Sequence, residues 1–194
     1  MSKLTPDHLF SLEQYARLRP EFRAKVIEHK KNRRLPLGAH AALYFEDALT
    51  MQYQVQEMLR IERIFEPEGI QDELDVYNPL IPDGHNWKAT FMLEYDDVEE
   101  RKAALAKLIG VERAIWLQVG EFAPVHPIAN EDLQRETEDK TASVHFVRFE
   151  LTPQMVSAVK AGNLIRAGID HPAYRVSVTV PPTVRASLAE DLEA

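Results

Sequence analysis

The clearest strand pattern in this sequence is Lys88-Ala89-Thr90-Phe91-Met92-Leu93-Glu94-Tyr95-Asp96. Ala89, Phe91, Leu93 and Tyr95 alternate with a mostly polar set, so one side of the strand is apolar and the other is largely polar. Such a strand is typical of an antiparallel or edge position. The pattern therefore indicates a sheet that helices cover on one face.

Four more segments show the same kind of alternation and are expected to be strands: 41–46, 114–119, 143–151 and 174–180. Helices are expected where a capping residue, such as Asp47 or Asp97, precedes an apolar stripe. These expected helices are 5–17, 20–33, 48–65, 71–77, 97–109 and 152–162, with another near the end of the chain. Pro20 is expected to separate the first two helices. The sequence thus predicts an α+β fold, with a mainly antiparallel sheet of about five strands, packed helices and a helical N-terminal segment of about 1–36.

Length and composition point to one domain spanning 1–194. The chain has 194 residues, of which 45% are hydrophobic and 28% are charged, and these are ordinary values for one globular domain. It contains no cysteine, which excludes a disulfide framework and a thiolate metal site. The first residues show no signal-peptide pattern and no apolar run approaches the roughly 20 residues of a membrane span. A cytoplasmic location without membrane association is expected.

Charge argues against nucleic acid as a partner. The formal net charge is −8, and an acidic surface repels phosphate. One basic run, over residues 25–34, lacks the interleaved aromatic side chains of a nucleic-acid site. We interpret it as a helix C-terminus whose cations complement the helix dipole, with an anion-binding patch as the alternative.

Familiar catalytic and cofactor motifs are missing. Neither phosphate-binding glycine motif occurs, nor does the nucleophile elbow. Seven histidines are present, but none forms a metal-binding pair at short spacing. His145 shares a strand face with apolar residues and is expected to be a hydrogen-bonded core histidine. No cofactor and no metal site are predicted, although histidines distant in sequence could still converge.

The long helix over 48–65 carries an unusual polar side. Gln52, Gln56 and Arg60 recur at intervals of four and line one ridge. Amides suit a satisfied buried network, whereas a solvated helix face more often carries lysine and glutamate. Two interpretations stay open, a helix whose amides bond neighbouring loops, and a ligand-binding surface. The residues predicted for that surface are Glu46, Gln54, Gln56, Glu57, Arg60, Glu62, Tyr77 and Asn78.

The same helix carries a family resemblance. Phe45-Glu46-Asp47, Thr50 and residues 54–62 resemble the signature of the bacterial family DUF3501. Residues 73–74, 77–82, 89–90 and 171–174 continue the resemblance over nearly the whole chain. The family implies no assigned activity or catalytic residue. It implies genomic association with rubrerythrin-type and iron–sulfur oxidoreductase proteins, and hence a role in redox or peroxide stress.

Three functional hypotheses follow, and whether the protein is an enzyme stays open. The first is a non-catalytic accessory or binding protein working beside an oxidoreductase partner, with Arg60 anchoring an anionic group. The second is a metal-dependent or acid–base enzyme that uses clustered Glu and His side chains, with Glu46, Glu57 and Glu62 as candidates by position. The third is a homodimer in which the long helix forms the subunit contact without a ligand.

Overall fold

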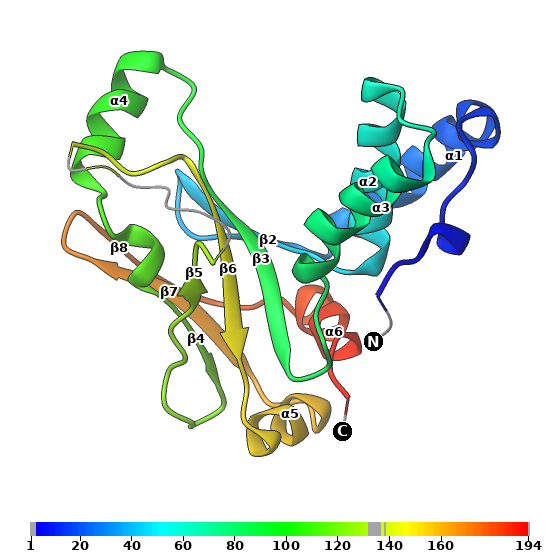
Figure 1. Ribbon diagram of the computed structural model, residues 1–194. Helices are drawn as coiled ribbons and strands as arrows, with labels where there is room; N and C mark the ends of the chain where they lie inside the picture. Colours follow the sequence, from blue (N-terminus) through cyan, green and yellow to red (C-terminus); the bar gives the residue numbers. More distant parts are fainter. Residues whose placement is uncertain (1–2, 132–136, 138, 194) are drawn as a thin grey trace.

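The computed structural model describes residues 3–131, 137 and 139–193, and within them the strands form two antiparallel sheets (Figure 1). The first sheet has the order β1 (Arg34–Pro36), β2 (Ala41–Phe45), β3 (Asn86–Leu93), β6 (Val144–Glu150) and β5 (Ile128–Ala129). The second has the order β4 (Ile115–Val119), β7 (Ile165–His171) and β8 (Tyr174–Thr179). The predicted α+β class with an antiparallel five-stranded sheet is confirmed.

The central strand β3 shows how the sequence pattern builds the main core. Ala89 pairs with Phe45 of β2 on one side and with Val147 of β6 on the other. Their apolar side chains share a buried cluster with residues of β4 and β7, so the apolar faces of the two sheets contribute to one core. Two helices, α5 (Pro153–Lys160) and α6 (Pro182–Glu190), supply further residues to this cluster.

A helical layer lies to one side of the sheets. It contains α1 (Leu12–Lys31), α2 (Ala48–Glu62) and α3 (Pro67–Tyr77), with the 3₁₀ turns η1 (Pro6–His8) and η2 (Asn78–Leu80) (Figure 1). These elements surround a second buried cluster made of Leu4, Met51, Val55, Leu59, Leu74 and Ile81. At the far side of the molecule α4 (Val98–Lys107) is followed by the 3₁₀ turn η3 (Val111–Arg113).

Helix starts follow their expected caps. The Asp47 carboxylate accepts a hydrogen bond from the Thr50 N–H at 2.9 Å and begins α2. The Asp97 carboxylate does the same for the Glu100 N–H at 2.8 Å and begins α4. Each cap satisfies one of the N–H groups that lack a partner in the first helical turn. Local chemistry therefore determines where these helices begin.

The N-terminal helices differ from the prediction. Thr5 and Pro6 start only the turn η1, and a separate cap at Ser11 begins α1, which continues through Pro20 to Lys31. The expected division into helices over 5–17 and 20–33 was wrong. Pro20 removes one backbone donor, but it lies on the exposed side of α1, where water can bond the carbonyl that loses its partner.

Three strands, β1, β5 and β7, were not expected. The segment of β7 alternates correctly, with Ile165, Ala167 and Ile169 buried, but Gly168 interrupts its apolar character. A Cβ on Gly168 would stand 2.4 Å from the Trp116 ring and from the Val176 carbonyl. The glycine therefore marks a close approach between strands. Because β4 and β8 pair with β7, they form a second sheet instead of extending the first.

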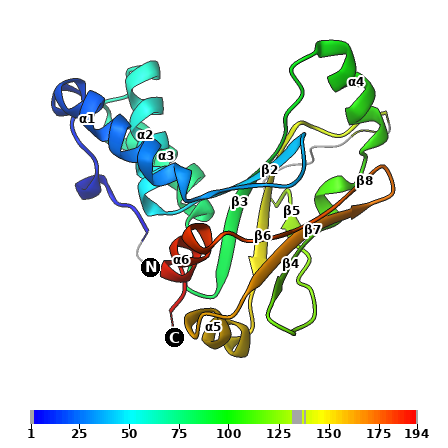
Figure 2. The same ribbon diagram turned by 180° about the vertical axis from the view of Figure 1, so that it is seen from behind.

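Arg33 joins the two layers. The predicted helix C-terminus holds for His29, Lys30 and Lys31, but Arg33 lies beyond the helix and is buried. Its guanidinium donates to the carbonyls of Phe45 and Glu46 at 3.0 Å each and to the Asp191 carboxylate at 2.5 Å. This one side chain therefore connects the end of α1, the β2–α2 junction and the C-terminal segment. The C-terminal segment lies beside α6 in both views (Figure 2).

Two further expectations concern the segment 130–141 and membrane-spanning helices. The polar and charged segment 130–141 is expected from the sequence to be a mobile excursion or a short exposed helix, and residues 132–136 and 138 of it lie outside the described residues. Among the residues that are described, no helix has the length and apolar character needed to cross a membrane.

Candidate functional site

The amide ridge of α2 holds the N-terminal segment 3–10, which we call the strap. Gln56 is completely buried, and its side chain accepts from the Phe10 N–H at 2.5 Å and donates to the Phe10 carbonyl at 3.3 Å. Gln52 donates to the His8 carbonyl at 2.6 Å. Asn78 bonds both the N–H and the carbonyl of Leu4, at 2.8 and 2.9 Å. These amides therefore bond main-chain groups of the strap, as the first interpretation of the ridge expected.

Glu57 is the centre of a charged cluster between α1 and α2. It accepts two hydrogen bonds from the Arg19 guanidinium, at 2.7 and 2.9 Å, and one from the Tyr15 hydroxyl at 2.7 Å. Arg60 adds a contact at 3.1 Å. The hydrogen bonds from Arg19 are the main reason that the pKa of Glu57 is lowered to about 2. Arg60 is exposed and is held by Glu57.

The remaining predicted residues point to different neighbours. Glu46 is buried at the β2–α2 junction and accepts from the Thr90 hydroxyl at 2.7 Å. Gln54 is half-buried and Glu62 is exposed near the end of α2. Tyr77 lines a cavity that the other seven predicted residues do not line. The eight residues are thus divided among different surroundings, and ligand binding by this set stays a prediction.

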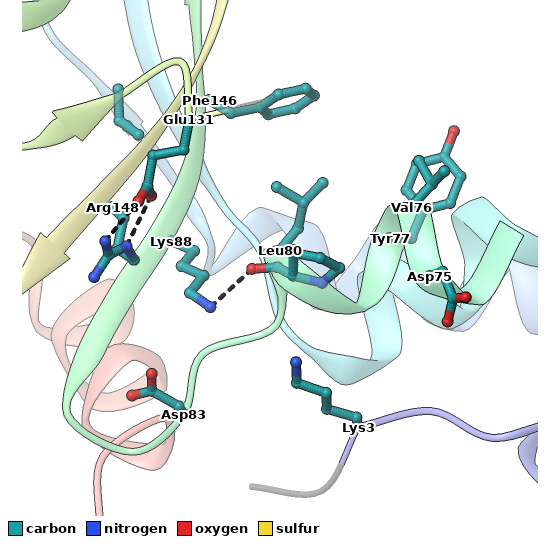
Figure 3. Close-up of a pocket in the computed structure, with 12 residues that line it drawn as sticks. Lys3, Asp75, Val76, Tyr77, Leu80, Asp83, Lys88, Glu131, Phe146 and Arg148 are labelled. Atoms are coloured by element: carbon teal, nitrogen blue, oxygen red, sulfur yellow. Dashed lines mark hydrogen bonds and ion pairs between the residues drawn. The ribbon is translucent and has the colours of Figure 1, made fainter. Parts of the chain in front are cut away.

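The cavity lies between the helical layer and the outer face of the first sheet. It has a volume of about 800 Å³. Figure 3 shows side chains from the strap, from α3 and η2 and from strands β3 and β6 converging on it. The lining residues are Lys3, Asp75, Val76, Tyr77, Pro79, Leu80, Asp83, Lys88, Glu131, Phe146, Val147 and Arg148.

Lys88 projects from the outer face of β3 toward η2. Its ammonium donates to the Pro79 carbonyl at 2.8 Å and to the Ile81 carbonyl at 2.9 Å. Burial lowers the pKa of Lys88. Asp83 opposes that effect, whereas the nearby cations Arg148 and Lys3 add to it. The cavity therefore holds a partly desolvated cation.

Arg148 and Glu131 form a paired wall of the same cavity. The guanidinium of Arg148 makes two bonds to the Glu131 carboxylate, at 2.9 and 2.7 Å, and a third to Glu150. The bonds from Arg148 lower the pKa of Glu131. At Asp83, burial raises the pKa, but hydrogen bonds from the His85 N–H and the Asn86 amide outweigh it, so this pKa is also lowered. Both carboxylates are thus held in the ionised form.

Three histidines make hydrogen bonds that serve the fold. His145 is completely buried, and its ring contacts the Thr141 hydroxyl at 3.0 Å, the Ala142 carbonyl at 2.9 Å and the Asn130 side chain at 3.1 Å. The predicted hydrogen-bonded core histidine is confirmed. Ring nitrogens of His126 and His171 contact backbone carbonyls. Across the described ranges, no three His, Asp or Glu side chains form a group able to hold a metal.

Sequence reasoning did not identify most of the cavity. Lys88 was assigned to the polar side of its strand, as any solvated lysine would be. The one available signal was Phe146, a large aromatic side chain at an outward position of β6 between Val144 and Arg148. An apolar ring on an outward face indicates a surface that something covers. Across the cavity from this ring lie α3 and η2, which come from a distant part of the chain.

Comparisons with known proteins agree with this architecture. The family model described as "Protein of unknown function (DUF3501)" matches residues 3–192. A solved crystal structure, of a novel protein of unknown function from Burkholderia pseudomallei K96243, is 50% identical in sequence. The match covers 99% of this chain and 100% of that one, with a TM-score of 0.94. A search of curated proteins produced no match. The chain belongs to the DUF3501 family.

Proposed function

We propose that this protein is a non-catalytic binding protein whose ligand occupies the cavity between the helical layer and the first sheet. The observation that carries the proposal is the cavity itself. Its volume of about 800 Å³ falls within the range of small-molecule sites, roughly 300–1,000 Å³. Apolar groups such as Leu80 and Phe146 line it, and six of its twelve lining residues are charged, so the cavity offers both an apolar surface and polar groups that could orient a ligand.

The state of the two cavity carboxylates favours binding over acid–base chemistry. A general acid or base works best when its pKa lies near the working pH. The pKa values of Asp83 and Glu131 are instead lowered, and both carboxylates are engaged in hydrogen bonds. Such groups orient a ligand and neighbouring cations more readily than they transfer protons.

A cavity-blocking variant tests the proposal. We would screen carboxylates, phosphates, amines and neutral amphiphiles by thermal shift and confirm hits by calorimetry. Val76 lines the cavity from α3 and is 62% exposed, so Val76→Trp narrows the site without disturbing the core. Ile61→Trp is the matched control, because Ile61 is 61% exposed and does not line the cavity. Binding should be lost in the first variant and kept in the second. Failure of every compound to bind, or equal binding by both variants, would refute the proposal.

The working context we propose is an accessory role beside an oxidoreductase partner in redox or peroxide stress. Support for it comes from the family resemblance in the sequence, which carries an association with such proteins. Affinity capture of the full chain from its native host, followed by mass spectrometry, should recover an oxidoreductase. Recovery of none under several growth conditions, including peroxide exposure, would refute this context.

A homodimer formed through the end of α2 is the alternative that one observation favours. Ile61 and Phe65 are 61% and 69% exposed, and large exposed apolar side chains often mark interaction surfaces. Light scattering should then give twice the chain mass, and Arg60→Ala or Phe65→Ser should shift it toward the monomer. A strict monomer at all concentrations would remove this alternative.

A further inference from the structure

We infer that the cavity takes an organic anion with an apolar body, and that its anionic group binds between the ammonium groups of Lys3 and Lys88. This inference rests on the proposed function, because it names the chemical class of the ligand for the same cavity. Lys88 contributes from strand β3, and Lys3 contributes from the strap. The two residues are brought to one cavity only by the fold.

Lys88 has bonding capacity left for a ligand. An ammonium group has three donors, and two of them reach the carbonyls of Pro79 and Ile81. A backbone carbonyl is a neutral acceptor, so the positive charge is compensated only in part, by the nearby carboxylates of Asp83 and Glu150. Burial penalises that charge, as the lowered pKa of Lys88 shows. A ligand carboxylate or phosphate would supply both the third acceptor and the missing negative charge.

Lys3 brings a second cation to the same space. Figure 3 shows its side chain pointing from the strap into the cavity, on the side where Lys88 lies. Lys3 is exposed, and within 3–131, 137 and 139–193 its ammonium has no hydrogen-bond or ion-pair partner. Its charge contributes to the lowered pKa of Lys88. Two like charges directed at one cavity are unfavourable alone and favourable around an anion.

The other charged groups of the lining are already engaged. Arg148 is bonded to Glu131 and Glu150. Both oxygens of Asp83 accept local hydrogen bonds, and Asp75 accepts one from Gln71 at 2.8 Å. After these pairings the two lysines are, among the described residues, the cations of the lining that no carboxylate holds at hydrogen-bond distance. The lining therefore selects for an anion, although its formal charges balance.

The apolar part of the ligand has a surface of its own. Val76 and Leu80 on the helical side and Phe146 on the sheet side line the cavity. Val76 is 62% exposed and Phe146 is half-exposed, so both would gain from being covered. Burying apolar surface contributes about 25 cal/mol per Å². A fatty acid, an alkyl phosphate or an aryl alkanoate has the required combination of one charged end and an apolar body.

Asn78 fixes the position of Lys3. The Asn78 side chain bonds both main-chain polar groups of Leu4, the next residue along the strap. Asn78 is therefore a positioning residue for the anion site and does not itself line the cavity. Its replacement should weaken the binding of anions more than that of neutral compounds, which a purely structural role would not do.

The test compares octanoate and octyl phosphate with octanol and octylamine, using calorimetry on the full chain. The anions should bind at least about ten-fold more tightly than octanol, as charge-assisted hydrogen bonds allow. Lys3→Met and Lys88→Met should each reduce this preference about ten-fold, because methionine keeps most of the apolar stem and removes the charge. Lys88→Arg should retain the preference. Lys107→Met is the matched control, since Lys107 is exposed on α4 and lies outside the lining.

The outcomes separate this inference from the proposed function. Equal binding of octanol and octanoate, or tighter binding of octylamine, would overturn the anion assignment and leave the binding protein intact. An anion preference that survives both lysine substitutions would also overturn it. Binding of no compound in any arm would refute both. Circular dichroism on each variant establishes that the fold is intact. A loss of binding then reflects the removed side chain and not unfolding.

Discussion

Gln56→Ala tests whether the amide ridge of α2 is a structural clamp. The side chain of Gln56 is completely buried and makes two hydrogen bonds to the main chain of Phe10. Removing it loses two bonds of about 1 kcal/mol each and leaves a part-buried N–H and C=O without partners, so the total cost is about 3 kcal/mol. We expect the strap to loosen and the free energy of unfolding to fall by that amount.

Urea denaturation followed by circular dichroism measures this loss. With a slope of about 3 kcal/mol per molar urea, the midpoint should fall by about 1 M. Gln54→Ala is the matched control, because Gln54 is half-buried on the same helix and has no hydrogen-bond partner among the described residues. It should change stability by no more than about 0.5 kcal/mol. Hydrogen exchange should show faster exchange at the Phe10 amide in Gln56→Ala only.

One result would refute the clamp. If Gln56→Ala and Gln54→Ala have the same midpoint, the bonds to Phe10 contribute nothing measurable and the buried glutamine needs another explanation. A loss of anion binding in Gln56→Ala without any loss of stability would instead favour the original prediction of a ligand surface on this helix.

Three further predictions concern charges and close packing. The pKa of Glu57 is lowered to about 2. The ionised Glu57 carboxylate therefore stabilises the fold fully above the ordinary pKa of a glutamate, and this stabilisation is lost as the pH falls toward about 2. Glu57→Gln should make the free energy of unfolding less dependent on pH in the acid range. Gly168→Ala should lower the free energy of unfolding by about 1–3 kcal/mol through overpacking. Gly162→Ala should lower it less, because its added methyl meets nothing within 4 Å and strains only the backbone. Thermal denaturation of both variants measures the difference. Arg33→Met should cost about 3–5 kcal/mol because it leaves the buried Asp191 unpaired, and adding Asp191→Leu should restore part of that loss in chemical denaturation.

Local sequence signals predicted the elements whose physics is local. The Asp47 and Asp97 caps were predicted correctly because a cap involves groups only three residues apart. Strand β3 was predicted because alternation between two environments is visible in any short window. Pro20 misled the same reasoning. Its cost depends on whether the freed carbonyl faces water, and that depends on which side of α1 packs against α2.

The division into two sheets could not be predicted from the alternation alone. A strand pattern shows which face is apolar but not which strand will be its neighbour. Pairing of β4 and β8 with β7 depends on Gly168, where the backbone must leave room for the Trp116 ring. In the sequence, this glycine only lowered the apolar character of its segment, and the strand was missed.

In the candidate sites, too, local sequence indicates some features and leaves others undetermined. The composition of the α2 ridge indicated satisfied amides, and the structure places Gln56 against Phe10, 46 residues away. The cavity depends on Lys88, Phe146 and Arg148, which occupy outward positions of their strands. Nothing within a few residues of Lys88, Phe146 or Arg148 indicates that α3 and η2 will lie across a cavity from the outward face of these strands.

The sequence alone determined the fold class, the starts of α2, α4 and α5 and the apolar faces of most strands, because these follow from side-chain periodicity and from hydrogen bonds across a few residues. The tertiary structure decided that two sheets share one core, that the buried Arg33 meets Asp191 across 158 residues, and that the strap brings Lys3 to the cavity beside Lys88. These arrangements depend on chain closure over long separations, where burial and charge pairing act between segments that no short window of sequence contains.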